Sequence, residues 1–325
     1  MTVLAQGLDD PFGLSYAHGK FYAAENGSGE VSGFVPGGSG PVVRASGFSG
    51  PAGVDRTPSR LLTVTGEGEG PGGSTLFVSS PGSPPRPLAD LGAYELAENP
   101  DGQRQFGDDG APLDALSNPF AVLGGRGGHE RFAYVADAGA NAVLAVDRDG
   151  AVSTFFAPPV VTSGACAGVP NNDPEHTGCD SVPTGLAFGP DGTLLVSALT
   201  GEVAGEGRVY VLDARTGALR RTITGLDGPT GVAAGDDGAV YVSELLEGAP
   251  AGAPEPGFDV STVGRIVRVA PDGARSVAQV TMPLGLRWAD GALHSTAWSV
   301  AGGFLQQRGL GQVVRVDARA FVAQD

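Results

Sequence analysis

Short apolar runs, separated by turns rich in glycine, proline and aspartate, extend along the whole chain. Runs such as 21–25, 132–137, 193–198 and 239–244 combine aromatic, valine and leucine residues with small ones, which is typical of β-strands. No run approaches the roughly 20 apolar residues that a membrane-spanning helix needs. The pattern therefore predicts an all-β protein without a membrane span.

One phrase, Pro-x-Gly followed by an apolar residue, organises these strands into repeats. Its six copies begin at Pro11, Pro51, Pro119, Pro183, Pro229 and Pro283, and only the third replaces the glycine, with Ala121. Each copy opens a strand, and a tight turn and three further strands follow. Four antiparallel strands per repeat make one blade of a propeller. The sequence therefore predicts a six-bladed β-propeller that forms a single domain over residues 1–325.

The last repeat lacks a fourth strand, because the chain ends soon after a third strand expected at Val313–Asp317. The segment Thr2–Leu8 precedes the first motif and belongs to no repeat. We expect this N-terminal strand to complete the last blade. Such pairing closes the ring and leaves no long open sheet edge.

The connections between strands fall into two classes that lie at opposite ends of a propeller ring. Strands one and two, and strands three and four, are joined by tight turns such as 189–192 and 235–238. The other end collects long segments at 91–117, 157–181, 245–262 and 299–311. Loops longer than about 12 residues in a compact domain are usually functional or disordered. We therefore predict ligand binding at this long-loop face, with candidate residues Tyr94, Glu95, Glu98, Asn118, Thr184, Thr230 and His294.

Acidic residues outnumber basic ones by 36 to 20, which gives a net charge of −16. Such a chain repels a phosphate backbone, so nucleic acid is not an expected partner. The acidity fits either cation binding or a well-solvated surface. We expect a monomer that binds a small molecule or a protein at one face of the propeller.

Cys166 and Cys179 are the only cysteines, and both lie in one polar stretch. We expect a disulfide that closes this loop, which for about 14 residues contributes ~3 kcal/mol in the chain-entropy model. A metal site with His176 is the alternative, although no C-x-x-C or H-x-x-x-H spacing accompanies it. A disulfide implies an oxidising compartment. We therefore expect a secreted or periplasmic protein whose leader has been removed, because residues 1–8 do not have the pattern of a signal peptide.

The last residue of strand two can be aligned across the repeats. The six positions hold Glu25, Thr65, Asp137, Ala198, Glu244 and Ala297. Carboxylates thus fall in alternate repeats, and oxygen ligands in such a ring suit a hard cation such as Ca²⁺. Asn26, Asn118 and Asn141 would add neutral oxygens. The alternative is structural, because an acidic residue at a strand end commonly bonds its own loop, as the spacing of Asp137 and Asn141 allows.

No catalytic motif of the G-x-S-x-G, H-E-x-x-H or G-x-x-x-x-G-K type occurs in the sequence. His294 falls in the second strand of the last repeat, where it is either a packed sheet residue or a general base. Glu95 and Glu98 are acid–base candidates in the first long loop. The sequence assigns no catalytic residue.

Four runs, 88–102, 116–123, 135–150 and 182–201, resemble the ScyD/ScyE family of exported propeller proteins. The likeness extends in register over almost the full chain, and it is most specific at Tyr94–Asp101 and Asp137–Asn141. It implies a six-bladed propeller, similar to NHL-repeat and gluconolactonase-type propellers, and export, without a defined reaction. The sequence departs from the family after Gly201, where EVAGEG replaces a stretch rich in proline and phenylalanine.

Two functions from different classes remain open. The first is a binding propeller that recognises a small molecule or a protein. The second is a divalent-metal-dependent hydrolase similar to lactonases of the gluconolactonase type, in which a metal ion in the channel activates water. Its expected Glu/Asn/Asn/Asp ligand set is partly matched by Glu25, Asn118, Asn141 and Asp137. A lyase similar to virginiamycin-inactivating propellers would need a seventh blade and a placed histidine, and the sequence indicates neither.

Overall fold

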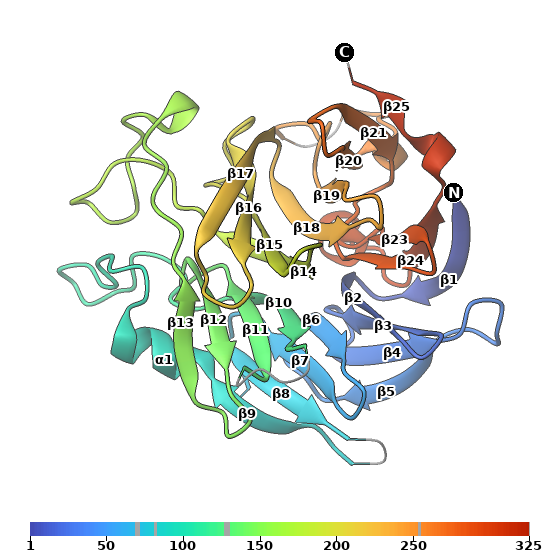
Figure 1. The fold of residues 1–325 in the computed structure, drawn as a ribbon, viewed down its shortest axis with the longest axis horizontal. Coiled ribbons are helices and arrows are strands. Elements are labelled where there is room, and N and C mark those ends of the chain that lie inside the picture. Colours follow the sequence, from blue (N-terminus) through green and yellow to red (C-terminus); the bar gives the residue numbers. More distant parts are fainter. Residues whose placement is uncertain (69–71, 81–82, 127–130, 253–254, 325) are drawn as a thin grey trace.

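A computed structural model of the chain shows six antiparallel sheets arranged around a central axis (Figure 1). It describes residues 1–68, 72–80, 83–126, 131–252 and 255–324. Each sheet is one blade of four antiparallel strands, and blade five carries one strand more. The predicted six-bladed β-propeller is therefore confirmed.

In five of the six blades, the inner strand begins at the proline of the repeated motif. Blades one to three contain β2 (Pro11–Ala17), β3 (Lys20–Glu25), β4 (Glu30–Phe34) and β5 (Val42–Ser46); β6 (Pro51–Arg56), β7 (Leu61–Thr65), β8 (Thr75–Ser79) and β9 (Arg86–Asp90); and β10 (Pro119–Gly124), β11 (Ala133–Asp137), β12 (Ala142–Val146) and β13 (Val152–Phe156). Blades four to six contain β14 (Pro183–Phe188), β15 (Thr193–Ala198), β16 (Gly207–Asp213) and β17 (Leu219–Leu226); β18 (Pro229–Ala234), β19 (Val240–Glu244), β20 (Arg265–Val269) and β21 (Arg275–Gln279); and β22 (Leu286–Ala289), β23 (Ala292–Ala297), β24 (Gly311–Val316) and β1 (Thr2–Leu8).

The first segment of the chain closes the ring, as predicted. Strand β1 pairs antiparallel with β24, from Thr2 opposite Arg315 to Leu8 opposite Gly311. The inner strands β22 and β2 also contact each other, so the ring is closed near the axis as well as at its rim. The sequence analysis did not foresee β25 (Val322–Ala323), which pairs with β21 as the fifth strand of blade five.

The close approach of the inner strands around the axis explains the glycine of the repeated motif. A Cβ atom on Gly13 would lie 2.8 Å from the Ala52 carbonyl oxygen in the next blade. A Cβ atom on Gly231 would lie 2.1 Å from the Leu284 carbonyl oxygen. Real side chains do not tolerate such contacts, so a residue without a Cβ is needed wherever neighbouring backbones meet at this level.

The hydrophobic core lies between the faces of neighbouring blades. One cluster joins Leu62 and Leu76 of blade two to Leu144 of blade three, and all three side chains are fully buried. The outermost strand is more exposed, as in β17, where most positions face solvent. Apolar residues on two sheet faces therefore hold each pair of blades together.

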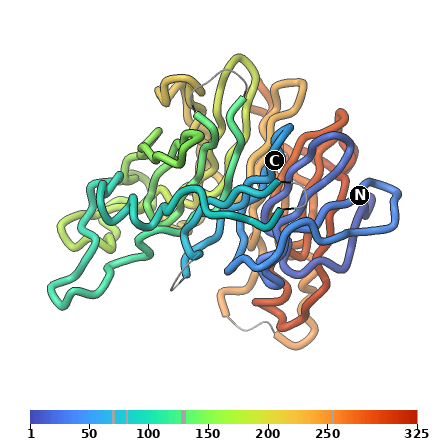
Figure 2. Tube along the Cα trace, turned by 90° about the horizontal axis from the view of Figure 1, so that it is seen from below, coloured from blue at the N-terminus to red at the C-terminus, as the bar shows by residue number. Residues whose placement is uncertain are grey.

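The long segments contain short helices that the sequence analysis did not predict. These are α1 (Leu91–Glu98), α2 (Ala301–Leu305) and the 3₁₀ turns η1 (Gly164–Cys166) and η2 (Val260–Thr262). A further 3₁₀ turn, η3 (Ala318–Ala320), lies between β24 and β25. Asp90 caps α1 by accepting a hydrogen bond from the Ala93 N–H, and Asn99 ends the helix in a left-handed conformation. The segments 99–117 and 157–181 project beyond the ring (Figures 1 and 2).

The predicted disulfide between Cys166 and Cys179 is confirmed, and it lies within the second of these projecting segments. Its sulfur atoms pack with Val161 and the partly buried Val203 in a small separate cluster. None of the helices in the described ranges is long and apolar enough to cross a membrane.

Candidate functional site

The strand-end carboxylates that were candidate metal ligands each bond the loop of their own blade. Glu25 accepts a hydrogen bond from the Asp9 N–H at 2.8 Å, and Glu244 accepts one from the Asp227 N–H at 2.7 Å. Asp137 accepts bonds from the Asn118 N–H and the Ser117 hydroxyl, at 2.7 and 2.6 Å. Burial raises the pKa of all three carboxyls, and these hydrogen bonds oppose the shift. In each blade the carboxylate thus fixes the loop that leads into the inner strand.

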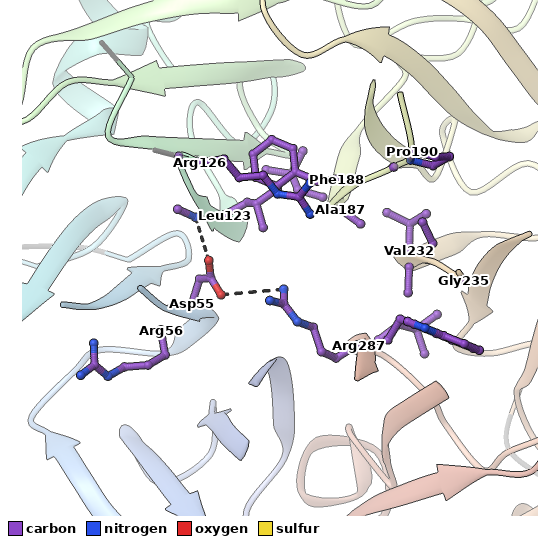
Figure 3. A pocket seen from close by; sticks show the side chains of 18 of the residues that line it. Asp55, Arg56, Leu123, Arg126, Ala187, Phe188, Pro190, Val232, Gly235 and Arg287 are labelled. Atoms are coloured by element: carbon purple, nitrogen blue, oxygen red, sulfur yellow. Dashed lines mark hydrogen bonds and ion pairs between the residues drawn. The ribbon is translucent and has the colours of Figure 1, made fainter. Parts of the chain in front are cut away.

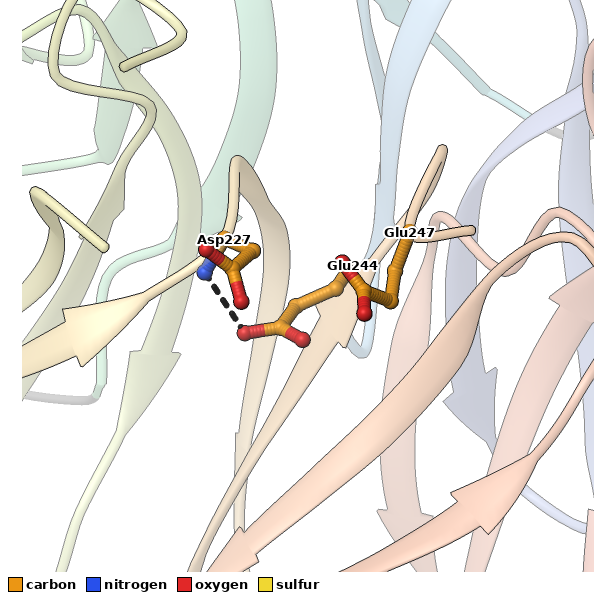
Figure 4. A group of neighbouring side chains, drawn as sticks. All are labelled: Asp227, Glu244 and Glu247. Carbon is orange, nitrogen blue, oxygen red and sulfur yellow. Dashed lines mark hydrogen bonds between the residues drawn. The ribbon is translucent and has the colours of Figure 1, made fainter. Parts of the chain in front are cut away.

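Glu244 also belongs to an acidic cluster with Asp227 and Glu247, shown in Figure 4. Within the described ranges this is the only group that brings ligand atoms from three acidic, histidine or cysteine side chains within 4.8 Å of one another. The guanidinium of Arg265 contacts all three carboxylates, at 2.9 Å for Asp227, 2.5 Å for Glu244 and 3.0 Å for Glu247. The protein's own cation is therefore paired with all three carboxylates and offsets part of their charge.

The asparagines of the candidate metal set are likewise used within the fold. Asn118 accepts a hydrogen bond from the Glu67 N–H at 3.0 Å through its side-chain oxygen. Asn141 accepts one from the Val182 N–H and donates one to Asp101, at 3.1 and 3.0 Å. The Asn26 backbone N–H donates to the Asp10 carbonyl. The contacts of Asn118 and Asn141 join loops of neighbouring blades, whereas that of Asn26 lies within blade one.

The candidate ligand residues of the long-loop face are divided among several environments. The Tyr94 hydroxyl lies 2.9 Å from the Thr154 hydroxyl on β13, Glu95 is buried, and Glu98 is exposed. Thr184 and Thr230 line a narrow section of the channel, where the free volume is only about 50 Å³. The cavities of the described structure do not bring all of these residues to one pocket.

The channel is narrow at its long-loop end because two aromatic rings meet across it. Phe12 and Phe120 have their ring centroids 5.8 Å apart, and both line the narrow section. The Thr184 hydroxyl donates to the Pro229 carbonyl of the next blade at 2.9 Å. The side chains at the second position of the repeated motif, such as Phe12, Phe120 and Thr184, therefore narrow the channel at this end.

His294 packs inside the sheet rather than in a loop. Its ring centroid lies 4.7 Å from that of Phe21, and the residue is only 5% exposed. Burial lowers its pKa, and the charge of Arg315 adds to this effect. This environment is that of a packed sheet residue and favours the neutral imidazole.

Glu95 lines a small cavity between the projecting segments, together with Asp101, Asn141 and Asp180. Burial raises the pKa of Glu95 to about 7, and the charges of Asp101 and Asp137 add to the shift. Burial also raises the pKa of Asp101, with a further contribution from Asp180. Several carboxylates are therefore crowded here in a poorly solvated place.

The largest cavity among those found in the described structure opens at the other end of the channel, where the tight turns lie. Its volume is about 750 Å³, and inner strands of blades two to six line it. Leu123, Leu186, Val232 and Leu286 form apolar walls, and Phe188 and Trp288 add aromatic surface. This turn-face cavity has the size and mixed lining of a small-molecule site.

Asp55 and Arg287 face each other across the turn-face cavity (Figure 3). One oxygen of Asp55 accepts a hydrogen bond from the Gly124 N–H at 2.8 Å, and the other accepts one from the Ser15 hydroxyl at 2.6 Å. The guanidinium of Arg287 lies 3.9 Å from the carboxylate, at the limit of an ion pair. The Asp55 carboxylate is therefore held mainly by neutral donors.

Arg126 supplies a second cation to the turn-face cavity. Its guanidinium lies over the Phe188 ring, 4.4 Å from the centroid, in a cation–π geometry. Burial lowers the pKa of Arg126, and the positive charge of Arg287 lowers it further. Arg56 also lines the cavity, but it points away and bonds the Arg60 carbonyl (Figure 3). The exposed Asp236 adds one carboxylate at the rim.

The sequence analysis missed these residues, although a signal for them exists. Counting four residues on from each motif proline gives Ser15, Asp55, Leu123, Ala187, Ala233 and Arg287. Two positions of this set carry a charge on an inner strand that faces the axis. A charge at a repeat position that is otherwise small or apolar would have indicated the turn-face cavity.

No family model matches the chain, and no curated protein matches it either. The ScyD/ScyE resemblance therefore stays a prediction. Solved structures, in contrast, are similar in fold. A gluconolactonase from Xanthomonas campestris is 14% identical with a TM-score of 0.58, over 97% of this chain and 89% of that one.

Two further solved structures show how varied the similar proteins are. Virginiamycin B lyase from Staphylococcus aureus is 13% identical with a TM-score of 0.52, over 100% of this chain and 86% of that one. A chain of a nidogen/laminin complex is 13% identical with a TM-score of 0.56, over 92% of this chain and 89% of that one. At such identities the likeness establishes the propeller fold and no activity.

Proposed function

We propose that this propeller binds a small organic anion in its turn-face cavity. The observation that carries the proposal is the pair of arginines, Arg126 and Arg287, in an apolar and aromatic cavity of about 750 Å³. Deep cavities with apolar walls and a few placed polar groups are the usual sites of small ligands.

The balance of charge in the cavity favours an anion. The chain as a whole carries a net charge of −16, yet two arginines, Arg126 and Arg287, face this cavity, and one of its two aspartates, Asp236, is exposed. Both oxygens of Asp55 already accept hydrogen bonds from the protein. The like charges of Arg126 and Arg287 disfavour each other, and a bound carboxylate would relieve that repulsion.

The cavity walls favour a ligand with an apolar body. Phe188 lies under Arg126, and Trp288 lies next to Arg287 on the same strand. An aromatic or aliphatic body would contact Leu186 and Val232 while its carboxylate meets the arginines. We therefore expect an organic carboxylate and not an inorganic ion.

The experiment uses tryptophan fluorescence, because Trp288 lines the cavity and Trp298 is the only other tryptophan. In a Trp298→Phe background, benzoate should quench or shift the emission, and its affinity should fall as salt is raised. Benzamide, a neutral molecule of nearly the same shape, should bind at least ten times more weakly. Equal binding of benzoate and benzamide would contradict the proposal.

Variants locate the binding. Arg287→Met should weaken benzoate binding at least ten-fold, whereas Arg319→Met, at an exposed position on η3, should leave it unchanged. Each variant is compared with the parent by its urea unfolding midpoint first, so that a loss of binding is not a loss of fold. Equal effects of the two substitutions would place the ligand elsewhere.

Binding of a ligand or protein at the long-loop face, and metal-dependent lactone hydrolysis, are the alternatives. The hydrolase would need Glu25, Asn118, Asn141 and Asp137 to act on one ion, whereas each of them bonds a loop. Lactone turnover that needs Ca²⁺ and is lost in Glu25→Gln would support the hydrolase.

We infer from the disulfide that the protein works in an oxidising compartment, as a secreted or periplasmic protein. Disulfides persist in such compartments and are rare in a reducing cytosol. A fusion of the protein, expressed from its own gene, to a reporter that is active only outside the cytoplasm would test this inference.

A further inference from the structure

The small cavity between the projecting segments contains an unusual concentration of oxygen atoms. Its lining comes from α1, from the loop after α1, from the start of β12 and from the loop that contains the disulfide. Five of the lining residues are carboxylates. Asp173 is paired with the His176 ring at 2.9 Å and Asp114 is exposed, whereas Glu95, Asp101 and Asp180 are bonded to neutral donors. The volume is about 30 Å³, which is room for a small ion together with about one water molecule.

Glu95 is the residue that most needs a further partner. It is 3% exposed, and its Oε1 accepts a hydrogen bond from the Gln105 amide at 3.0 Å. Its Oε2 is buried and has no hydrogen-bond partner within the described part of the chain. A buried carboxylate oxygen without a partner is costly, so either a proton or a cation is expected there.

Asp101 and Asp180 are held by neutral donors. Asp101 accepts from the Gln103 N–H at 2.9 Å and from the Asn141 amide at 3.0 Å. Asp180 accepts from the Gln103 amide at 2.7 Å and from the Asn171 amide at 2.9 Å. No ion pair to Glu95, Asp101 or Asp180 is found among the described residues.

The one arginine of the lining does not neutralise this cavity. Arg104 directs its guanidinium to the Phe106 carbonyl at 2.8 Å and to Asp108 at 2.5 Å. The cluster around Glu244 is the opposite case, because Arg265 contacts each of its three carboxylates. Among the described residues, the fold thus supplies a cation to the carboxylates of that cluster and none to Glu95, Asp101 or Asp180.

We propose that the Glu95 cavity is a calcium site in which Glu95, Asp101 and Asp180 provide the charge. Oxygen-only donors on loops of irregular shape suit Ca²⁺, which accepts six to eight oxygens in flexible geometry. These carboxylates do not lie within 4.8 Å of one another, unlike the Asp227 group. Water and amide oxygens therefore complete the coordination.

The site would join two parts of the molecule that project beyond the ring. Glu95 and Asp101 follow blade two, whereas Asp180 directly follows Cys179 of the disulfide and precedes blade four. A cation between them would fix the segments 99–117 and 157–181 against each other. This calcium site differs from the metal site that the sequence suggested at the strand ends. Of the candidate ligands named there, Asn141 is the one that lines the Glu95 cavity.

The test is titration of the full chain, stripped with EGTA, with calcium chloride in a calorimeter and in a thermal unfolding assay. We expect one binding event with a dissociation constant below about 1 mM, and a rise of the unfolding midpoint on addition of Ca²⁺. Glu95→Gln and Asp101→Asn should each weaken binding at least ten-fold. Glu247→Gln is the matched control, because it removes a carboxylate from the cluster that is paired with Arg265, and it should bind Ca²⁺ as the parent does.

The stability of Glu95→Gln in the absence of metal distinguishes two roles of Glu95, as a ligand of a cation or as a purely structural residue. If Glu95 awaits a cation, Glu95→Gln should be at least as stable as the parent in EGTA and insensitive to added Ca²⁺. No binding by the parent at 5 mM Ca²⁺, or binding by Glu95→Gln equal to that of the parent, would overturn the proposal. Equal loss in Glu247→Gln would also overturn it, because the ion would then lie elsewhere.

Discussion

Buried carboxylates show how strongly the role of one residue depends on the donors around it. Asp137 is fully buried and accepts hydrogen bonds from N–H and hydroxyl donors of the loop before its blade, so its role is to fix the conformation of that loop. Glu244 is equally buried but has the Arg265 guanidinium beside it. Glu95 has no arginine beside it, and one of its carboxylate oxygens has no hydrogen-bond partner in the described part of the chain. The same side-chain chemistry therefore gives a structural link, an internal ion pair and a proposed cation site.

Removing the guanidinium from the Asp227, Glu244 and Glu247 cluster should destabilise the fold. Arg265→Met leaves the fully buried Glu244 without its ion-pair partner, which typically costs about 3 kcal/mol of unfolding free energy. The measurement is urea unfolding at pH 7.5. Adding Glu244→Gln to the variant should restore part of the loss, and a midpoint for Arg265→Met equal to that of the parent would show that the pairing contributes nothing.

His294 should make the stability depend on pH in a defined direction. Its pKa is lowered by burial in the folded protein, so between that value and the unfolded pKa of 6.5 the unfolded chain binds more protons. Stability from this residue is therefore present above pH 6.5 and is lost as the pH falls. His294→Leu should reduce the difference between unfolding midpoints measured at pH 7.5 and pH 5.5.

The control for this experiment is His18→Asn, which changes an exposed histidine in a turn. Its midpoints should show the same pH difference as the parent. Comparison of the two variants is needed because Glu25 and Glu244, whose pKa values are raised, contribute a slope of the opposite sign. An unchanged difference in His294→Leu would mean that the imidazole is protonated equally in both states.

At the scale of elements, the strands were predictable because each repeat contains the same sequence features: the Pro-x-Gly motif, apolar runs and tight turns. The glycine of Pro-x-Gly meets a steric demand that a neighbouring inner strand imposes, as Gly231 does against Leu284. Apolar runs and tight turns then fix the other strands. The helix α1 was not predicted, since its eight residues give too short a pattern, and its capping contacts, such as Asp90 to the Ala93 N–H, are evident only in the fold.

The candidate site was less predictable, because it depends on which repeats stand across the axis from each other. Asp55 and Arg287 lie 232 positions apart in the sequence, and only closure of the ring places them 3.9 Å apart. The same holds for Glu95 and Asp180, which come from two separate long segments. Site residues that lie far apart in the sequence can be found from one sequence only by comparing equivalent positions of all repeats.

The disulfide should protect the loop that it closes from proteolysis, and it should affect this loop more than the rest of the propeller. Glu175 is exposed within the loop that Cys166 and Cys179 close, and the loop contains neither lysine nor arginine. In the double variant Cys166→Ser, Cys179→Ser, a Glu-specific protease should cut at Glu175 several times faster than in the parent. Equal cutting rates on a reducing gel would show that the crosslink does not order this segment.

The whole molecule carries its charge unevenly, and this distribution links the two proposals. The chain has a net charge of −16, yet the turn-face cavity at one end of the axis holds Arg126 and Arg287. The cavity of Glu95 lies among the long segments at the other end and is acidic. An anion and a cation would therefore bind at separate places. Benzoate binding should not depend on calcium, and calcium binding should survive Arg287→Met.

We expect closure of the ring by the first strand to stabilise the whole molecule. Strand β1 covers β24, and it buries Leu8 and Ala5 against Val313 and neighbouring residues. Deleting residues 1–9 would expose the β24 edge together with this apolar surface, and such edges pair with other chains. We expect the unfolding midpoint to fall by more than 10 °C, with a rise in oligomers on size-exclusion chromatography.

A matched truncation and a peptide rescue separate ring closure from the mere loss of chain. Deleting residues 322–325 removes β25, whose residue Val322 is 67% exposed, so it should change the midpoint little. A synthetic peptide of residues 1–9 should bind the truncated protein as an added strand and raise its midpoint, as in donor-strand complementation. A scrambled peptide should not. An unchanged midpoint after deletion of residues 1–9 would mean that contact between β22 and β2 holds the ring closed without the outer strand.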